Sequence, residues 1–336
     1  GRYSFLDTLD NDGVRDFPLE VALDMTVEGE RLVLDFSRSS PQCAGPVNIS
    51  RATATAACYV GLKHLFPDVP ANAGVLDAVE IVLPDGLILS AARPRPMGGY
   101  TETILRMIDV IFSAAAQADP TLPPAQSYGT INALSIAGVR TQGAQRGQRW
   151  VMFSFFGGGH GGHSEGDGLN HGNAPISTAT IPPLEILEAA YPVRFTQWAL
   201  RPASAGEGRH RGGLGAIYEI ELLEQEAEGF IFGERGRSSP KGIAGGGDAA
   251  PNRFGYRNGD RWHTPPMASK MLGIQLKRGD RVRLETPGGG GWGDARLRDA
   301  ARLAYDQAAG YLETHTGAWS SATTTDTDPA TENGHE

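Results

Sequence analysis

The stretch LEVALDMTVEGERLVLDF (residues 19–36) alternates apolar and polar side chains on both sides of a short polar turn. Apolar residues stand at every second position between residues 19 and 27, and again at Leu32, Leu34 and Phe36. A period of two is typical of a strand with one buried face, and the Glu28-Gly29-Glu30 segment favours a turn. The sequence therefore predicts a β-hairpin that buries one face in a core.

Helical patterns follow this hairpin. RATATAACYVGLKHLF (residues 51–66) predicts a small-residue helix that ends before Pro67, and YTETILRMIDVIFSAAAQA (residues 100–118) repeats apolar side chains with a period of 3.6. A short helix is expected in PPLEILEAAYP (residues 182–192) and a closing amphipathic helix at residues 295–312. Further strands are expected at residues 79–83, 130–136, 150–156, 193–200, 216–223 and 281–286.

Groups of strands with a few packed helices, and no regular βαβ alternation, indicate a mixed α and β (α+β) fold without a Rossmann or P-loop domain. We expect two parts of one region, residues 1–150 and a β-rich part at residues 151–316. Residues 317–336 are poor in apolar side chains and predict a disordered tail.

Composition narrows the classes of partner. The formal net charge of -9 over 336 residues argues against nucleic-acid binding, which needs clustered Lys and Arg. No apolar run is long enough for a membrane helix. Two cysteines, Cys43 and Cys58, favour a reducing compartment, the cytoplasm. The first residues, GRYSFLDTLDNDG, lack Met and a signal-peptide core, so we expect a fragment or a processed chain.

Glycine is abundant, with 45 residues gathered in clusters such as 157–159, 245–247 and 288–291. Such clusters let the backbone turn sharply or approach another chain closely. No cluster matches G-x-x-x-x-G-K-[ST], and no G-x-G-x-x-G opens a helix, so we expect no nucleotide site in this chain. Close backbone approach at tight corners is the interpretation we favour for RHRGGLGA and ETPGGGGWGD.

FFGGGHGGHSEGDGLNHGN (residues 155–173) is the densest cluster of metal-ligand residue types. It holds His160, His163 and His171 together with Glu165 and Asp167. Imidazoles plus a carboxylate are typical ligands of zinc or manganese. The stretch is too rich in glycine for the helix that gives HExxH sites their geometry, so a surface or interface loop with polar histidines is the alternative.

Glu102 follows Gly98-Gly99 in the first turn of the expected helix at residues 100–118. A carboxylate there is favoured by the helix dipole and could act in catalysis, or it could simply be a good first-turn residue. No G-x-S-x-G elbow is present, and neither cysteine lies in a visible nucleophile motif.

Six motifs, in order, resemble the hydantoinase B/oxoprolinase family from the N-terminus to about residue 312. They are LDNDG (residues 9–13), PANAG (70–74), GGYTET (98–103), LRPASAGEGRHRGGLG (200–215), GIAGGG (242–247) and RGDRVRLETPGGGGWGD (278–294). The resemblance implies a B-type subunit, or part of one, in an ATP-dependent hydrolase that opens cyclic amides, as hydantoinases and 5-oxoprolinases do.

The resemblance also implies a division of labour between subunits. An A-type, ATP-binding partner, with its Mg, would phosphorylate the substrate, and the B-type subunit would complete the reaction within a hetero-oligomer. Acetone and acetophenone carboxylases are related to this family, so the first alternative to a hydrolase subunit is a subunit of an ATP-dependent ketone carboxylase. A non-catalytic module that holds the partner is the second.

Family members carry a divalent metal, zinc or manganese, on Asp and His ligands that would lie ahead of residue 1. We therefore expect the metal of the full subunit to be ligated outside this chain and expect no metal ligand within it. No family ligand falls on His160, His163 or His171. These three histidines, Asp167 and Glu102 remain candidate catalytic residues, lining a substrate channel or a subunit interface.

Overall fold

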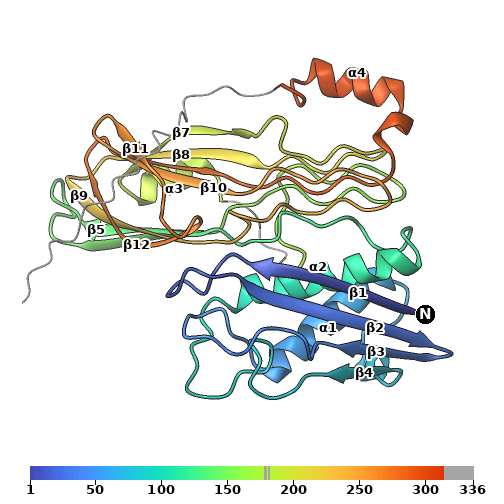
Figure 1. Cartoon of the computed structure of the whole chain (residues 1–336). Coiled ribbons are helices and arrows are strands. Elements are labelled where there is room, and N and C mark those ends of the chain that lie inside the picture. Colours follow the sequence, from blue (N-terminus) through green and yellow to red (C-terminus); the bar gives the residue numbers. More distant parts are fainter. Residues whose placement is uncertain (178–179, 181, 314–336) are drawn as a thin grey trace, which may run out of the picture.

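The computed structural model describes residues 1–177, 180 and 182–313 of the chain. The N-terminal unit is a four-stranded sheet in the order β1-β2-β3-β4 (Figure 1). The strands are β1 (Arg2–Leu9), β2 (Leu19–Glu28), β3 (Arg31–Asp35) and β4 (Val79–Val82). The expected tail at residues 317–336 lies outside the described residues.

The predicted hairpin is confirmed. Strands β2 and β3 pair antiparallel up to Glu28 opposite Arg31, and Gly29 turns the chain with a φ of 58°. Leu19, Val21 and Leu23 are buried, but Val27 is 41% exposed because it lies at the turn end of the hairpin. The period-two pattern therefore predicts the buried face correctly except at the tip.

Two helices cover this sheet. Helix α1 (Arg51–Leu65) begins where the Ser50 hydroxyl accepts a hydrogen bond from the Thr53 amide at 3.2 Å. Helix α2 (Tyr100–Ala118) matches its predicted bounds and packs on α1, β1 and β2. The 3₁₀ helix η1 (Ala73–Leu76) precedes β4. One apolar core joins the sheet and both helices.

Strands β5 to β13 form a β-sandwich (Figure 1). Its two sheets have the orders β12-β9-β5-β6 and β11-β10-β13-β8-β7. The strands are β5 (Ala133–Val139), β6 (Arg149–Ser154), β7 (Val193–Leu200), β8 (Ala216–Leu222), β9 (Glu226–Phe232), β10 (Arg253–Asn258), β11 (Arg261–His263), β12 (Lys270–Lys277) and β13 (Arg281–Glu285).

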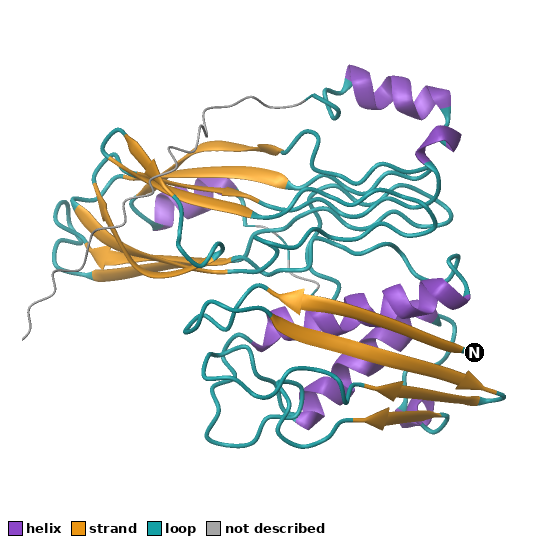
Figure 2. Cartoon of the chain, viewed as in Figure 1, coloured by secondary structure: helices purple, strands orange, loops and turns teal. Residues whose placement is uncertain are grey.

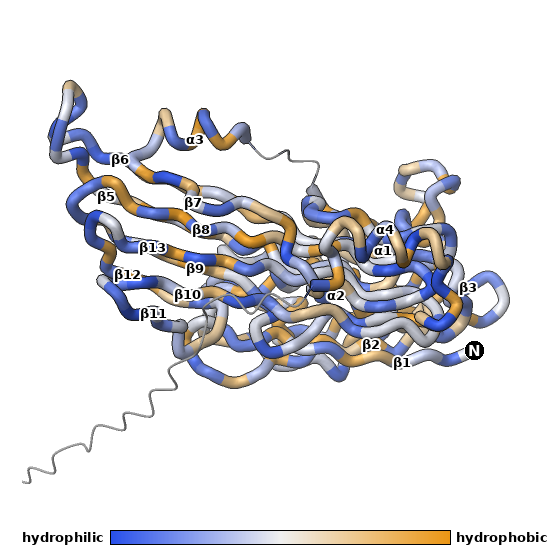
Figure 3. Tube along the Cα trace, turned by 90° about the horizontal axis from the view of Figure 1, so that it is seen from above, coloured by the Kyte–Doolittle hydropathy of each residue, from blue (hydrophilic) through white to orange (hydrophobic). Residues whose placement is uncertain are grey.

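A second apolar core fills the space between the two sheets, with Ile136 and Ile231 on one side and Ile220 and Leu284 on the other. Hydrophobic and hydrophilic stretches alternate along these strands (Figure 3). The short helix α3 (Leu184–Ala190) is confirmed and packs on β7. The expected boundary at residue 150 stays a prediction; it falls within β6, which pairs with β5.

The expected closing helix at residues 295–312 is wrong in extent. A 3₁₀ turn, η2 (Ala295–Leu297), is followed by the shorter helix α4 (Ala300–Ala308). Asp299 separates them, because its extended backbone leaves the helix and its side chain accepts hydrogen bonds from the Ala301 and Arg302 amides.

Between the sandwich and α4, glycine-rich segments run side by side as the loops in Figure 2. We call them the glycine bundle; they are residues 157–162, 206–215, 241–247 and 287–293. Backbone hydrogen bonds join them, such as the Gly213 amide to the His160 carbonyl at 2.7 Å and the Gly289 amide to the Gly213 carbonyl at 2.9 Å. A Cβ at Gly159 would stand 1.9 Å from the Gly213 carbonyl oxygen.

The predicted close backbone approach is thus confirmed, but it extends along whole segments instead of corners. Only glycine lets backbones pack at such distances, and the amides then find partners in neighbouring segments. With four α-helices and thirteen strands among the described residues, the α+β fold class is confirmed.

Candidate functional site

A cavity of about 720 Å³ lies where the N-terminal unit meets the sandwich. The N-terminal unit contributes the start of α2 and the loop after β1, and the sandwich contributes the ends of β6, β9 and β12. Its size is within the range of small-molecule sites. Among the described lining residues, Glu102 and Lys270 are the only acid and the only base.

Glu102 lies in the first turn of α2, at the base of the cavity. Its side chain is 1% exposed, and its Oε1 accepts a hydrogen bond from the Ile131 amide at 3.0 Å. Its Oε2 is buried without a hydrogen-bond partner among the described residues. Burial raises the pKa of Glu102 to about 8, and the nearby charge of Glu234 adds to that rise. The carboxyl is therefore largely protonated at neutral pH and can donate or take up a proton.

The start of α2 approaches the sandwich closely. Gly99 is the N-cap, and a Cβ on it would lie 2.5 Å from the Phe232 ring. A Cβ on Gly98 would meet nothing within 4 Å. Glycine at position 99 thus allows the start of α2 to approach the Phe232 ring, whereas position 98 has space for a side chain.

Lys270 begins β12 and is buried beside the Phe232 ring, with its Nζ 5.3 Å from the ring centroid. It forms an ion pair with Glu234 and donates to the Asn11 carbonyl at 3.2 Å. Glu234 also accepts a hydrogen bond from the Asp10 amide at 2.7 Å. The LDNDG loop is thereby tied to the sandwich, and the charge of Lys270 is already matched inside the protein.

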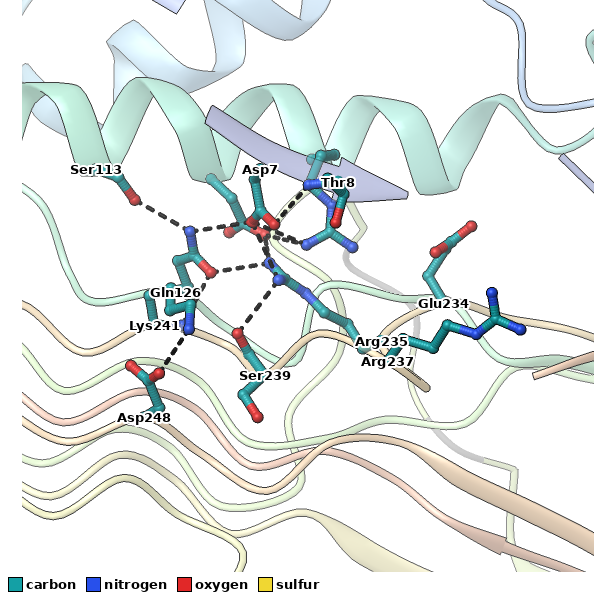
Figure 4. Close-up of polar contacts among 12 residues, drawn as sticks. Asp7, Thr8, Ser113, Gln126, Glu234, Arg235, Arg237, Ser239, Lys241 and Asp248 are labelled. Atoms are coloured by element: carbon teal, nitrogen blue, oxygen red, sulfur yellow. Dashed lines mark hydrogen bonds and ion pairs between the residues drawn. The ribbon is translucent and has the colours of Figure 1, made fainter. Parts of the chain in front are cut away.

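A buried ionic cluster lies between the N-terminal unit and the sandwich (Figure 4). Arg235 donates to Asp7 at 3.1 Å and to Asp109 at 2.5 Å, and Arg106 donates to Asp7 at 3.0 Å. The Gln126 side-chain oxygen accepts from Arg235 at 2.9 Å. Burial raises the pKa of Asp109 well above its usual range, although Arg106 opposes the rise. Since Asp7 belongs to β1 and Arg235 follows β9, the cluster joins the two parts of the chain.

The histidines of residues 155–173 lie in or beside the glycine bundle, and none lines the cavity. His160 Nε2 forms a hydrogen bond with the Asn173 carbonyl oxygen at 2.5 Å, and burial lowers the pKa of this histidine. His171 contacts the Tyr218 hydroxyl and the Trp198 indole, and burial lowers its pKa too. His163 is exposed, and its Nδ1 accepts from the Glu165 amide at 3.3 Å.

Asp167 has structural partners. It forms an ion pair with Arg298 at 2.9 Å and accepts a hydrogen bond from the Arg211 amide at 2.8 Å. It therefore ties the segment before α4 to the glycine bundle. The structure brings Glu102 alone, of the five candidate residues, into the cavity, and a catalytic role for any of them stays a prediction.

Metal binding was the chemistry suggested by residues 155–173. Within residues 1–177, 180 and 182–313, no group of three or more His, Cys, Asp or Glu side chains could hold a metal ion. This part of the chain does not fit a zinc or manganese site. The expectation of ligands outside this chain stays a prediction.

Sequence reasoning missed Lys270, Glu234 and the aromatic wall of the cavity. Glu234 and Arg235 form an adjacent acid and base directly after the alternating strand EAEGFIF (residues 226–232). A charged pair at the end of an apolar strand was the signal that could have found them. Lys270 carries no such signal, because the sequence does not distinguish a buried lysine at a strand end from an exposed one.

The hydantoinase B/oxoprolinase family model matches residues 1–295. An uncharacterised protein of Methanocaldococcus jannaschii is 30% identical over 288 residues, covering 85% of this chain and 49% of that protein. The B subunit of a putative D-/L-hydantoinase from a Pseudomonas species is 25% identical, covering 92% of this chain and 52% of that protein. A 5-oxoprolinase of Dictyostelium discoideum is 28% identical, covering 88% of this chain and 22% of that protein. This chain spans about half the length of the first two relatives.

Two solved structures share the fold. An ATP-dependent caprolactamase from Pseudomonas jessenii aligns with a TM-score of 0.78 at 23% identity, over 93% of this chain and 55% of that one. Acetone carboxylase in a nucleotide-free state aligns with a TM-score of 0.77 at 20% identity, over 93% of this chain and 47% of that one. No helix among the described residues is long and apolar enough to span a membrane.

Proposed function

The chain belongs to the hydantoinase B/oxoprolinase family, as its motifs predicted, and from this premise we propose that it forms part of an ATP-dependent enzyme that hydrolyses the C–N bond of cyclic amides. Relatives named as a hydantoinase and as 5-oxoprolinases support this proposal. The observation that carries the proposal to a site is the buried Glu102 in the lining of a ligand-sized cavity, where burial raises the pKa of its carboxyl.

Glu102 is the proton donor in this proposal. Hydrolysis of a cyclic amide forms a C–O bond from water to the carbonyl carbon and breaks the C–N bond, and the departing ring nitrogen must gain a proton to leave as an amine. The protonated Glu102 carboxyl gives that proton and becomes a carboxylate, which then regains a proton from solvent. Lys270, whose charge lowers the pKa of Glu102, favours the ionised form that results.

We also propose an A-type, ATP-binding partner in a hetero-oligomer, because the name of the Pseudomonas relative marks it as one of several subunits and this sequence has no nucleotide-binding motif. We propose that residues outside this chain bind the divalent metal, zinc or manganese. The roles proposed for the cavity are carried out by its protein side chains. We propose the cytoplasm as the compartment, since Cys43 and Cys58 are free thiols.

The test uses the full-length protein with its ATP-binding partner. ATP-dependent ring opening of a cyclic amide, with ADP formed in step, is the expected result. Glu102→Gln should lower turnover by roughly 100-fold or more while the partner still binds, because Gln cannot donate an acidic proton. Glu165→Gln is the matched control, since Glu165 is an exposed residue outside the cavity, and its turnover should be unchanged.

Two results would overturn this proposal in different directions. Incorporation of labelled bicarbonate into an acid, without ring opening, would favour the ketone carboxylase that the fold shared with acetone carboxylase also allows. Full turnover in Glu102→Gln would favour a chain that only holds its partner.

A further inference from the structure

The upper wall of the cavity is aromatic. Phe230 and Phe232 project from β9, and Phe153 and Phe155 project from β6 and the residue after its end. The rings of Phe153 and Phe155 meet edge to face with centroids 5.0 Å apart, and those of Phe230 and Phe232 stack at 6.4 Å. Two pairs of phenylalanines, one on β9 and one at the end of β6, therefore line this side of the cavity.

These rings lie on the outer face of their sheet, away from the sandwich core, and Phe232 also packs against the core of the N-terminal unit. Ser135 of β5 pairs with both Phe153 and Phe230, which places the two rings on either side of a small residue. Phe153 is 52% exposed and Phe155 is 51% exposed, whereas neighbouring Met152 is fully buried in the sandwich. Exposed aromatic clusters beside a cavity are typical of ligand-binding surfaces.

Charge in the cavity disfavours an anionic ligand. Lys270 is the one cation among the described lining residues, and Glu234 and the Asn11 carbonyl already occupy it. An added carboxylate would lie near the Glu234 carboxylate, without a free cation among those lining residues to pair with. Burying an unpaired charge is unfavourable, and a like charge nearby adds to the cost.

We propose that the substrate of this enzyme carries an uncharged apolar arm, aryl or branched alkyl, which packs on Phe153, Phe155, Phe230 and Phe232 while the amide end faces Glu102. This inference rests on the proposed function and adds which class of substrate the same site prefers. A cavity of about 720 Å³ holds a five- or six-membered ring together with such an arm. A ring bearing a carboxylate, as in 5-oxoproline, binds poorly.

The experiment compares cyclic amides that share one ring and differ only in the arm: carboxylate, methyl or benzyl. With the full-length protein and its partner, kcat/KM for the benzyl compound should exceed that for the carboxylate compound by at least about tenfold. Phe230→Ala should lower kcat/KM for the benzyl compound about tenfold, mainly through KM, and leave the methyl compound little changed. Phe66→Ala, at an exposed phenylalanine outside the cavity, is the matched control and should change neither.

A variant that adds a positive charge and a direct binding measurement test the substrate preference independently of ring opening. Phe230→Arg should reverse the preference toward the carboxylate compound. Binding of the benzyl and carboxylate compounds is measured by calorimetry on the same protein without ATP. Weaker benzyl than carboxylate binding would overturn the inference even if rings are opened. Tighter benzyl binding without any ring opening would support the inference and refute the hydrolase proposal.

Discussion

A Cβ atom on Gly159 would stand 1.9 Å from a backbone oxygen, whereas the same atom on Gly98 would meet nothing within 4 Å. Gly159 belongs to the glycine bundle, where segments far apart in sequence pair through their backbones. Gly98 lies at the start of α2, beside the cavity. Both glycines belong to clusters that look alike in the sequence, but at Gly159 the missing side chain lets backbones touch, whereas at Gly98 a side chain would fit.

The two regions also differ in how they are held together. The glycine bundle depends on backbone hydrogen bonds and close packing, which do not titrate. The cavity and the buried ionic cluster depend on ionisable side chains such as Glu102, Asp7 and Arg235. The backbone contacts of the glycine bundle should therefore not respond to pH, whereas the stability contributed at Glu102 should.

The largest expected effect comes from Gly159→Ala. Its new Cβ overlaps the Gly213 carbonyl, which is rigid backbone already bonded to the Gly289 amide. The segments must separate, and the free energy of unfolding should fall by about 3 kcal/mol or more. Urea denaturation followed by circular dichroism measures this change.

Gly98→Ala is the matched control for that prediction, because φ at Gly98 is not in the left-handed region and the position is open. Its free energy of unfolding should stay within about 0.5 kcal/mol of the parent protein. Equal losses at both positions would mean that the glycine bundle is not packed as described.

Local patterns predicted the local structure well. The hairpin at residues 19–36 and the helix at residues 100–118 were found because a period of two or 3.6 is written in consecutive residues. The glycine bundle was not foreseen, since its contacts join residues such as Gly159 and Pro287, which are far apart in the chain. Nothing in one segment shows which other segments will lie against it.

The candidate site shows the same division. Glu102 was singled out because its place in a first helical turn is a local feature. Lys270 and Glu234 were not, because their ion pair joins residues separated by 36 positions. The histidines drew attention by their density, yet the structure uses His160 and His171 in contacts with Asn173 and Tyr218.

The second prediction concerns the pH dependence of stability at Glu102. Its pKa in the folded protein is about 8, against 4.5 for an ordinary glutamate. Because the folded state holds the proton more tightly, wild-type stability is lost as pH rises from about 4.5 to about 8. Glu102→Gln lacks this loss, so its stability relative to wild type should grow with pH by up to about 1.4 kcal/mol per unit and level off above pH 8.

Urea denaturation of both proteins from pH 5 to pH 9 measures that difference. Glu165→Gln is the control, since its exposed side chain should give a curve parallel to wild type. Parallel curves for Glu102→Gln as well would show that the buried carboxyl titrates normally and would remove the physical basis for its role as an acid.

The smallest expected effect is at His163, and it tests whether the histidine-rich stretch belongs to the scaffold. Its ring is exposed, and the hydrogen bond that its Nδ1 accepts comes from the neighbouring Glu165 amide, which solvent can replace. His163→Ala should change the free energy of unfolding by less than about 0.5 kcal/mol and leave ATP-dependent turnover of the assembled enzyme unchanged. A loss of turnover with unchanged stability and assembly would mean that this face of the glycine bundle contributes to a reaction site after all. The glycine bundle would then have a role in the reaction as well as in the structure.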